Sequence, residues 1–454
     1  MPQPSKLLIA NRGAVAARVQ RAARQLGMRT VCVFSDADAD LPYLDDADER
    51  HHIGPAPAPQ SYLSVEAIME AARRSGADAV HPGYGFLSEN ADFADAVQQA
   101  GLLFVGPDAR WLRQMGHKTR ARTLMAGHGM PVCPSSDVLR GNLDERIAVA
   151  ASVGFPLMVK PAGGGGGIGM QAVENAQSLG DALERAGKLA ARSFGSDEVY
   201  VERLLTRPRH IEFQIVGDRH GDVRHLFERD CSLQRRHQKV IEEARAPLLP
   251  EAELDAMGER AAAILRKLGY DNLGTVEMLH DASVGFSFLE INTRLQVEHG
   301  VTEQITGIDL VQAQIQLAAG ARLSEVLPER VVARGHAIQL RLYAEDPVRF
   351  LPAPGRLEVF DMPSLPGVRI ETGYRQGNQI TPFYDPMIGK LIATAADRAA
   401  AIELALRAID AIRIEGIKTN LPFLRKVLLS PEFRAGDVHT GLAPQIAKAP
   451  NAVT

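Results

Sequence analysis

Short apolar runs alternate with segments of helical pattern over the first 110 residues, and this alternation restricts the fold more than any other feature of the chain. The apolar runs at 7–10, 30–34, 79–81 and 102–105 have the length of strands. The segments 14–27 and 61–74 between them have the length of helices. Strands separated by helices form parallel βαβ units. The sequence therefore predicts an N-terminal doubly wound α/β domain with a parallel sheet.

The pattern changes near residue 116 and again near residue 331. In the middle region, strands are expected at 156–159, 170–173, 199–201 and 211–215, and a hairpin is expected from 274–279 and 286–291. This order predicts a mixed antiparallel α+β region. After residue 331 we expect strands at 336–342 and 357–360 and a helix at 397–412, which together indicate a mixed α/β domain.

The composition excludes several classes of protein. The 51 Lys and Arg residues nearly balance the 55 Asp and Glu residues, which argues against a nucleic-acid-binding protein. Cys32, Cys133 and Cys231 are too far apart for a disulfide framework or a cysteine-based zinc site. No apolar run approaches the roughly 20 residues of a membrane span, and the run at 7–10 is too short for a signal peptide. We therefore expect a reduced, soluble, cytoplasmic protein with no nucleic-acid or membrane partner.

A run of five glycines at 163–167 follows Lys160 and is the most distinctive local motif. Gly164, Gly166 and Gly169 match the dinucleotide pattern G-x-G-x-x-G, but that pattern requires a helix after the loop, and residues 170–173 predict a strand. The run is therefore interpreted as a flexible flap whose backbone N–H groups can approach a polyphosphate. A flexible linker without function is the alternative.

Polar side chains alternate along residues 290–298. In an extended chain, Glu290, Asn292, Arg294, Gln296 and Glu298 would share one face, and Glu277 would lie on the neighbouring hairpin strand. Two carboxylates and an amide oxygen are ligands that Mg²⁺ favours, and Glu298 could act as a general base. The alternative is a solvated polar face on an edge strand. The basic run 235–239, taken alone, predicts a solvated surface.

Taken together, these segments resemble biotin carboxylase, a family of the ATP-grasp superfamily. The similarity covers about residues 6 to 440 and includes the glycine flap with Lys160. The other matching stretches are 9–13 (IANRG), 81–90 (HPGYGFLSEN), 228–232 (ERDCS), 234–239 (QRRHQK), 290–298 (EINTRLQVE), 344–347 (AEDP), 384–391 (YDPMIGKL) and 416–420 (GIKTN).

The resemblance implies three domains and a reaction. We expect an N-terminal pre-ATP-grasp domain at 1–115, an ATP-grasp domain at 116–330 with a mobile lid at about 131–204, a C-terminal biotin carboxylase domain at 331–446, and a tail at 447–454. ATP and bicarbonate would form carboxyphosphate and ADP, and the carboxyl group would pass to the ureido nitrogen of biotin. The implied cofactors are ATP and Mg²⁺ or Mn²⁺, with carrier-linked biotin as substrate.

The resemblance also assigns roles to individual residues. Glu298 would be the base, and Arg341 would stabilise the biotin enolate. Bicarbonate would be bound by Lys239, Arg294, Gln296 and Val297, and the metal ions by Glu277, Glu290 and Asn292. The ATP-binding residues would be Lys118, Lys160, Gly166, Gly167, Glu202, Arg203, Leu204, Leu205, His210, Gln234, His237, Glu277 and Glu290.

Several positions depart from the family pattern. Ile168 occupies a flap position where the family usually has a basic residue, and Gln339 stands where it usually has Glu. Gly300 and Arg245 each replace a Pro. None of these changes removes a metal or bicarbonate group, and together they suggest a divergent paralogue.

The expected partners are separate chains. No Ala-Met-Lys-Met biotinylation motif occurs, and the chain ends soon after the third region, so we expect a biotin carboxyl carrier protein and carboxyltransferase subunits on other polypeptides. A homodimer is the family expectation. Two alternatives stay open: an ATP-grasp carboxylate–amine ligase with another substrate, and a nucleotide-binding regulatory paralogue.

Overall fold

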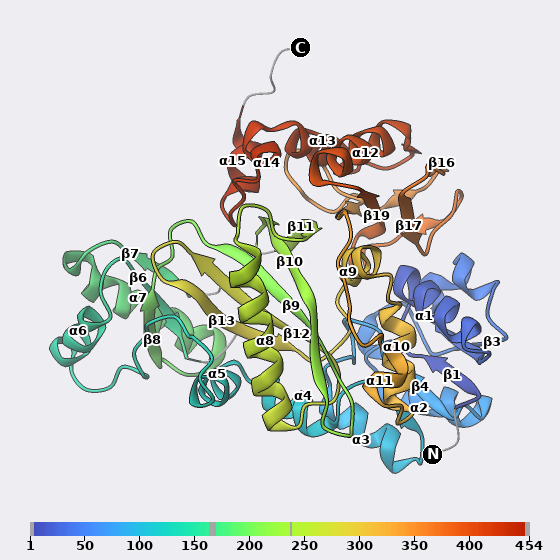
Figure 1. Ribbon diagram of the computed structural model, residues 1–454, viewed down its shortest axis with the longest axis horizontal. Helices are drawn as coiled ribbons and strands as arrows, with labels where there is room; N and C mark the ends of the chain where they lie inside the picture. Colours follow the sequence, from blue (N-terminus) through green and yellow to red (C-terminus); the bar gives the residue numbers. More distant parts are fainter. Residues whose placement is uncertain (1–3, 163–168, 237, 450–454) are drawn as a thin grey trace. The chain divides into compact units, whose positions relative to one another are not determined.

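The computed structural model describes residues 4–162, 169–236 and 238–449 and divides into two compact units (Figure 1). The first unit contains residues 1–121, 210–277 and 290–454, and the second contains residues 122–209 and 278–289. None of the helices in the described part of the chain combines the length and apolar composition that a membrane span requires.

The N-terminal part of the first unit is a five-stranded parallel sheet in the order β3-β2-β1-β4-β5, which confirms the predicted doubly wound domain. Its strands are β1 (Lys6–Ile9), β2 (Arg29–Phe34), β3 (Glu49–His52), β4 (Ala79–His81) and β5 (Leu103–Phe104). The helices are α1 (Gly13–Gln25), α2 (Val65–Ser75), α3 (Ala91–Gln99) and α4 (Ala109–Met115). The helix expected at 61–74 begins later, at Val65, because the Ser64 side chain accepts a hydrogen bond from the Ala67 N–H and caps it.

A long sheet, antiparallel from β9 to β17, carries the residues of the candidate site. Its eight strands follow the order β13-β12-β9-β10-β11-β14-β19-β17. They are β9 (Arg209–Gly217), β10 (Val223–Arg235), β11 (Gln238–Ala244), β12 (Asn272–Asp281), β13 (Gly285–Asn292), β14 (His336–Tyr343), β17 (Val368–Thr372) and β19 (Met387–Ala395). Because β11 pairs with β14, strands from both sides of residue 331 belong to one sheet.

Helices α8, α9 and α12 of the first unit pack on this sheet. The helices of this part are α8 (Glu251–Leu268), α9 (His299–Thr306), α10 (Leu310–Ala318), α11 (Leu323–Val326), α12 (Arg398–Ala411), α13 (Leu421–Leu429), α14 (Pro431–Ala435) and α15 (Leu442–Lys448); α5 (Lys118–Gly127) begins in this unit. Two small sheets pair β15 (Gly355–Arg356) with β18 (Gln379–Ile380) and β16 (Val359–Asp361) with β20 (Arg413–Glu415). Ile402, Leu406 and Ile409 of α12 are buried, as the periodicity predicted.

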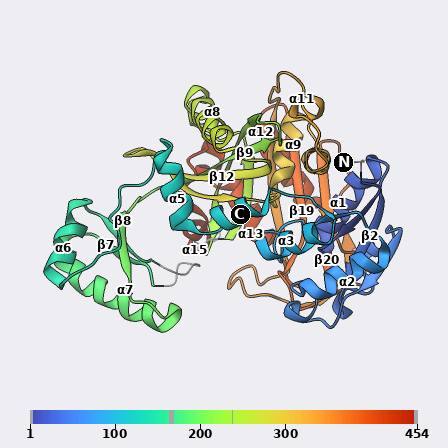
Figure 2. The same cartoon turned by 90° about the horizontal axis from the view of Figure 1, so that it is seen from below.

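The second unit is a small α/β unit. Its antiparallel sheet has the order β7-β6-β8, with β6 (Leu157–Pro161), β7 (Gln171–Val173) and β8 (Val199–Arg203). Helix α7 (Leu179–Phe194) packs on this sheet, and α6 (Leu143–Ser152) packs on α7 (Figure 2). β7 confirms the strand expected after the glycine run, while the run itself, at 163–167, lies outside the described residues.

Candidate active site

Lys239, on β11, is the centre of the site. Its Nζ lies 2.7 Å from Oε2 of Glu212, 3.0 Å from Oε1 of Glu277 and 2.7 Å from Oε1 of Glu298. Burial lowers the pKa of Lys239, but the three carboxylates outweigh it and hold the pKa well above its ordinary value. The expectation of a solvated basic surface at 235–239 is wrong for this side chain, which is 13% exposed and surrounded by carboxylates.

Glu298 lies in the turn before α9, where its side chain is fully buried between two cations. Oε1 faces Lys239, and Oε2 accepts a hydrogen bond from Nη2 of Arg341 at 3.0 Å. Burial raises the pKa of Glu298, but Lys239 and Arg341 lower it more strongly, so the group stays ionised. Glu298 is therefore an unprotonated carboxylate held at a defined position.

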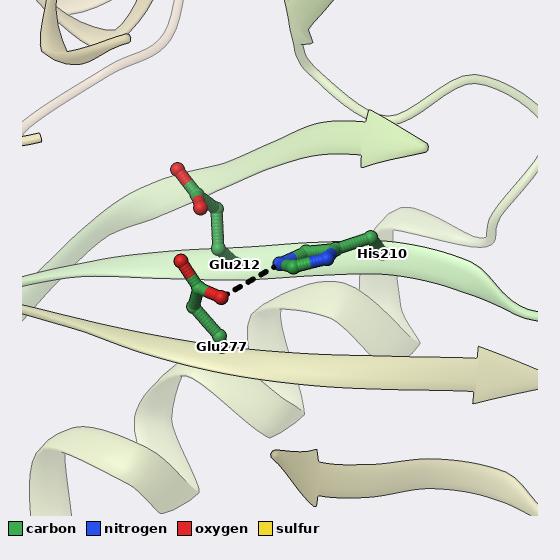
Figure 3. A group of neighbouring side chains, drawn as sticks. All are labelled: His210, Glu212 and Glu277. Carbon is green, nitrogen blue, oxygen red and sulfur yellow. Dashed lines mark ion pairs between the residues drawn. The ribbon is translucent and has the colours of Figure 1, made fainter. Parts of the chain in front are cut away.

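Three residues of the sheet form a cluster of metal-ligand type, which Figure 3 shows. His210 and Glu212 come from β9 and Glu277 from β12, and Nε2 of His210 lies 3.0 Å from Oε2 of Glu277. The cluster already holds protein cations: Lys239 contacts both carboxylates, and Nε of Arg229 donates to Glu212. We therefore interpret Glu212 as the group that holds Lys239 in place.

Glu212, Arg229 and Glu242 are parts of this network that the sequence analysis missed. Arg229, on β10, is fully buried and donates to Glu212, to Oε1 of Gln214 at 2.8 Å and to Oγ1 of Thr302 at 2.9 Å. The sequence signal that could have revealed Glu212 is the alternation of polar residues, Glu212 and Gln214, with apolar residues in 211–215. Charged side chains at alternate positions of a strand whose residues are all buried require partners within the protein.

The polar residues after β13 converge, but the geometry is not the one predicted. The strand ends at Asn292, so the alternation expected through residue 298 is wrong beyond that point. Arg294 joins the side chains instead: it donates to Oδ1 of Asn292 and to Oε1 of Gln296, each at 2.9 Å. Asn292 and Gln296 both donate to Oε1 of Glu277, at 2.7 and 3.2 Å.

Two further contacts complete the surroundings of this loop. Nε of Arg294 lies 2.9 Å from Oε2 of Glu89 in the N-terminal part of the unit. The Val297 carbonyl accepts a hydrogen bond from the buried Lys390 at 2.8 Å. The loop from 293 to 298 is thus fixed by side chains from three separate parts of the chain.

The residues expected to bind metal have the right donor chemistry. Nζ of Lys118 lies 2.7 Å from Oε2 of Glu290. Burial lowers the pKa of Lys118, but the negative charges of Glu290, Glu277 and Glu89 raise it more, so the net pKa is higher than usual. Several carboxylates therefore stabilise a positive charge at this point. The carboxylates of Glu277 and Glu290 and the amide oxygen of Asn292 supply oxygen donors of the kind that Mg²⁺ prefers. Glu277, Glu290 and Asn292 therefore fit the metal.

The other predicted ATP residues divide into three groups. Gln234 lies in the first unit and its Nε2 is 2.9 Å from Nδ1 of His210. In the second unit, Lys160 pairs with Glu202, and Arg122, a residue not predicted, lies 3.2 Å from the same carboxylate. Arg203 ends β8, and Leu204 and Leu205 follow it. Gly166, Gly167, Ile168 and His237 lie outside the described residues.

Comparison with known protein families matches three models along the chain. Residues 3–112 match the biotin carboxylase N-terminal domain, residues 117–326 match the ATP-binding domain of the carbamoyl-phosphate synthase L chain, and residues 339–445 match the biotin carboxylase C-terminal domain. The fold and these matches define an ATP-dependent ligase.

Individual relatives agree over nearly the full chain. The biotin carboxylase of Halalkalibacterium halodurans is 48% identical over 96% of both chains, and biotin carboxylase 2 of Bacillus subtilis is 45% identical over 97% of this chain and 99% of that protein. The biotin carboxylase–β-γ-ATP complex from Campylobacter jejuni has a TM-score of 0.91 at 40% identity, covering 98% of this chain and 99% of that one. The chain belongs to the biotin carboxylase family.

Another solved structure bears on the ligands. It is the biotin carboxylase domain dimer of Hydrogenobacter thermophilus 2-oxoglutarate carboxylase in complex with MgADP, ADP and bicarbonate. Its TM-score is 0.90 at 37% identity, and the match covers 99% of this chain and 100% of that one.

Proposed function

We propose that this chain carboxylates carrier-linked biotin, using bicarbonate and ATP with Mg²⁺, through a carboxyphosphate intermediate. The observation that carries the proposal is the continuous chain of contacts from Glu277 through Lys239 and Glu298 to Arg341. In these contacts the buried carboxylate of Glu298 lies between two cations, and in the proposal it is the base and each cation can hold an anion. The family and its ligand-bound structures support the same reaction.

The anion-binding part of the site consists of Lys239, Arg294 and the amide of Gln296. Positioned cations and donors stabilise charge that develops on the substrate, and they need little reorganisation because they are already fixed. In the structure, Lys239 contacts Glu298 directly. Bicarbonate bound at Lys239 would compete for this contact, and the pKa of Glu298 would then rise toward that of a useful base.

The metal supplies electrostatic stabilisation of the phosphates when it is bound, and Glu277, Glu290 and Asn292 would hold it. His210 and Lys118 carry donors beside these ligands and would contact phosphate oxygens. ATP would be bound by Lys160, Gly166, Gly167, residues 202–205, Gln234 and His237. Arg341, held by Glu242 and Glu298, would stabilise the biotin enolate.

The partners and the assembly are also part of the proposal. The relatives include carboxylase subunits, such as the propionyl-CoA carboxylase alpha chain of Ruegeria pomeroyi, which is 45% identical over 96% of this chain and 67% of that protein. We propose a carrier protein and a carboxyltransferase on separate chains, a homodimer, a cytoplasmic location, and the domain boundaries expected above.

A coupled assay of ADP release tests the function. We expect release in the presence of ATP and Mg²⁺ that depends on bicarbonate and increases with free biotin. ADP release that responds to neither compound would contradict the proposal and favour a ligase with another substrate. Tight ATP binding without turnover, with a biotinylated carrier present, would instead favour a regulatory protein.

A further inference from the structure

Two carbonyl groups in the turn before α9 are each bound by a buried side chain. The Gln296 carbonyl accepts a hydrogen bond from Nδ1 of His299 at 2.6 Å, and the Val297 carbonyl accepts one from Nζ of Lys390 at 2.8 Å. His299 is the first residue of α9 and is fully buried, and Lys390 of β19 is 1% exposed. The proposed function uses neither of these two side chains.

The ring of His299 donates to the Gln296 carbonyl as a neutral group. Burial and the positive charge of Lys390 hold the pKa of His299 well below its ordinary value, so the ring is uncharged at neutral pH. A neutral imidazole has one N–H, and the ring nitrogen that faces a carbonyl oxygen must carry it. The Nδ1–H of His299 is therefore a donor held in place by the start of α9.

Lys390 is held in place by the strand beside it. It stands directly opposite Glu371 of β17, and its Nζ lies 2.7 Å from Oε2 of Glu371. Burial raises the pKa of Glu371, but the charges of Lys390 and Arg369 lower it more strongly, so the carboxylate stays ionised. Oε1 of Glu371 pairs with Arg369 and, at 3.1 Å, with Arg21. Glu371 would therefore keep cationic partners if the ammonium group of Lys390 were removed.

A bound carbonyl fixes the whole peptide group to which it belongs. The carbonyl of one residue and the N–H of the next lie in one rigid plane and, in a trans peptide, point in opposite directions. The His299 contact therefore sets the direction of the Val297 N–H, and the Lys390 contact sets the peptide group that leads into Glu298. Within residues 4–162, 169–236 and 238–449, the Val297 N–H has no hydrogen-bond partner, so it can donate to a bound anion.

We propose that His299 and Lys390 are positioning residues that fix the peptide groups on the two sides of Val297. The Val297 N–H is thereby directed at bicarbonate, and Glu298 is held where its carboxylate meets Arg341. This inference rests on the proposed function, in which Val297 and Glu298 act on bicarbonate. Each positioning residue acts through a backbone carbonyl and not through the substrate.

Steady-state kinetics of substituted proteins test the two residues. Lys390→Met and His299→Leu remove the donors and leave apolar side chains in their places. We expect KM for bicarbonate to rise about tenfold in each, because a peptide group that can rotate holds the anion less well, while KM for ATP changes less than about twofold. His299→Asn retains a donor near the position of Nδ1 and should keep KM for bicarbonate within about threefold of the parent value.

Arg398→Met is the matched control for the loss of a cation that pairs with a buried carboxylate. Arg398 is 16% exposed and binds both oxygens of Glu243, which keeps His336 as a partner when Arg398 is replaced. The control should lower Tm, as Lys390→Met does, but leave KM for bicarbonate unchanged. A parallel rise of both KM values in Lys390→Met, or a KM for bicarbonate equal to that of the control, would overturn the inference. Equal KM values for bicarbonate in His299→Leu and His299→Asn would overturn it for His299.

Hydrogen exchange of the protein without ligands tests the same contacts without any reaction. In this turn the His299 N–H donates to the Gln296 carbonyl and the Val301 N–H to the Glu298 carbonyl, each at 3.3 Å. Peptides that cover 293–301 should exchange severalfold faster in Lys390→Met and His299→Leu than in Arg398→Met, because the turn is released. Exchange equal to that of the control would overturn the inference. Absence of bicarbonate-dependent ADP release in the parent would contradict only the proposed function.

Discussion

Replacement of Lys239 by Met tests whether the site is organised around one ammonium group. The variant keeps an unbranched side chain that is one atom shorter and removes the charge that faces Glu212, Glu277 and Glu298 at 2.7–3.0 Å. At an effective dielectric constant of about 20, one such contact corresponds to roughly 6 kcal/mol, much of which offsets the cost of burying the ammonium. Loss of one partner of a buried ion pair costs about 3–5 kcal/mol. We expect a loss of stability in this range.

The loss should depend on pH in a defined direction. In the parent, Lys239 lowers the pKa of Glu277 and Glu298 against the effect of burial. The contribution of these ion pairs to folding stability is therefore fully present above the pKa of glutamate in the unfolded state, about 4.3, and is lost as the pH falls through the lower folded-state pKa. In the variant, at least one of the three carboxylates retains a proton, and its raised pKa makes the folded state lose stability as the pH increases. The difference in Tm between parent and variant should therefore be larger at pH 8 than at pH 5.5.

Thermal unfolding at these two pH values measures the effect. For a protein of this size, about 4 kcal/mol corresponds to a decrease in Tm of roughly 5 °C. Lys188→Met is the matched control, because Lys188 is exposed and pairs with Glu184 at i,i+4 on the same helix. The control should stay within 1 °C of the parent. If Lys239→Met also stays within 1 °C at both pH values, the ammonium does not organise the site and the reasoning is refuted.

Three further predictions concern the reaction. Glu298→Gln should reduce bicarbonate-dependent ADP release at least 100-fold in a turnover assay. The Kd for ATP, measured by nucleotide titration, should change less than threefold, and loss of ATP binding would assign Glu298 another role. Addition of EDTA should abolish ADP release and excess Mg²⁺ or Mn²⁺ should restore it, and release that persists after chelation would count against Glu277 and Glu290 as metal ligands. Ile168→Arg should lower the apparent KM for ATP severalfold if a flap cation binds phosphate, and an unchanged KM would show this departure to be neutral.

The fold was predictable where local pattern decides the structure. Alternation of apolar runs and helical segments predicted the parallel sheet of β1 to β5, because strand and helix periods differ clearly. The strand at 357–360 was less well placed, and the observed β16 spans Val359–Asp361. The short edge strand β3 was missed, because Glu49–His52 consists of four charged or polar residues without an apolar run.

The site was predictable where a motif carries it. Glu298, Lys239 and Arg341 were identified by resemblance, and the structure brings them into one network. Glu212, Arg229 and Glu242 were missed because a charged residue in a strand usually indicates a solvent-facing position. Their burial depends on how β9, β10 and β11 pair with one another and with β14, which is distant in sequence, so only the tertiary structure shows that each charge has a partner.

In the loop after β13, the side chains that were predicted to lie together do so, although the strand predicted to align them is absent beyond Asn292. Strand periodicity predicted one shared face for residues 290–298, yet the strand ends at Asn292. The side chains still converge, because the guanidinium of Arg294 donates to the residues two positions before and two positions after it. A planar group with several donors replaces the regular spacing of a strand.

The register of β14 against β19 has a consequence for how this enzyme can fail. Arg341 stands opposite Lys390, and its chain neighbours Leu340 and Leu342 are buried core residues on the other face. A slip by one position would therefore move the guanidinium from the site to the hydrophobic face of the sheet and bring the two leucines to the site. The alternation of side chains along β14 therefore determines both the packing of the core and the placement of Arg341. A sheet with a shifted register would be unstable as well as inactive, so an inactive protein with a stable fold is not expected from this error.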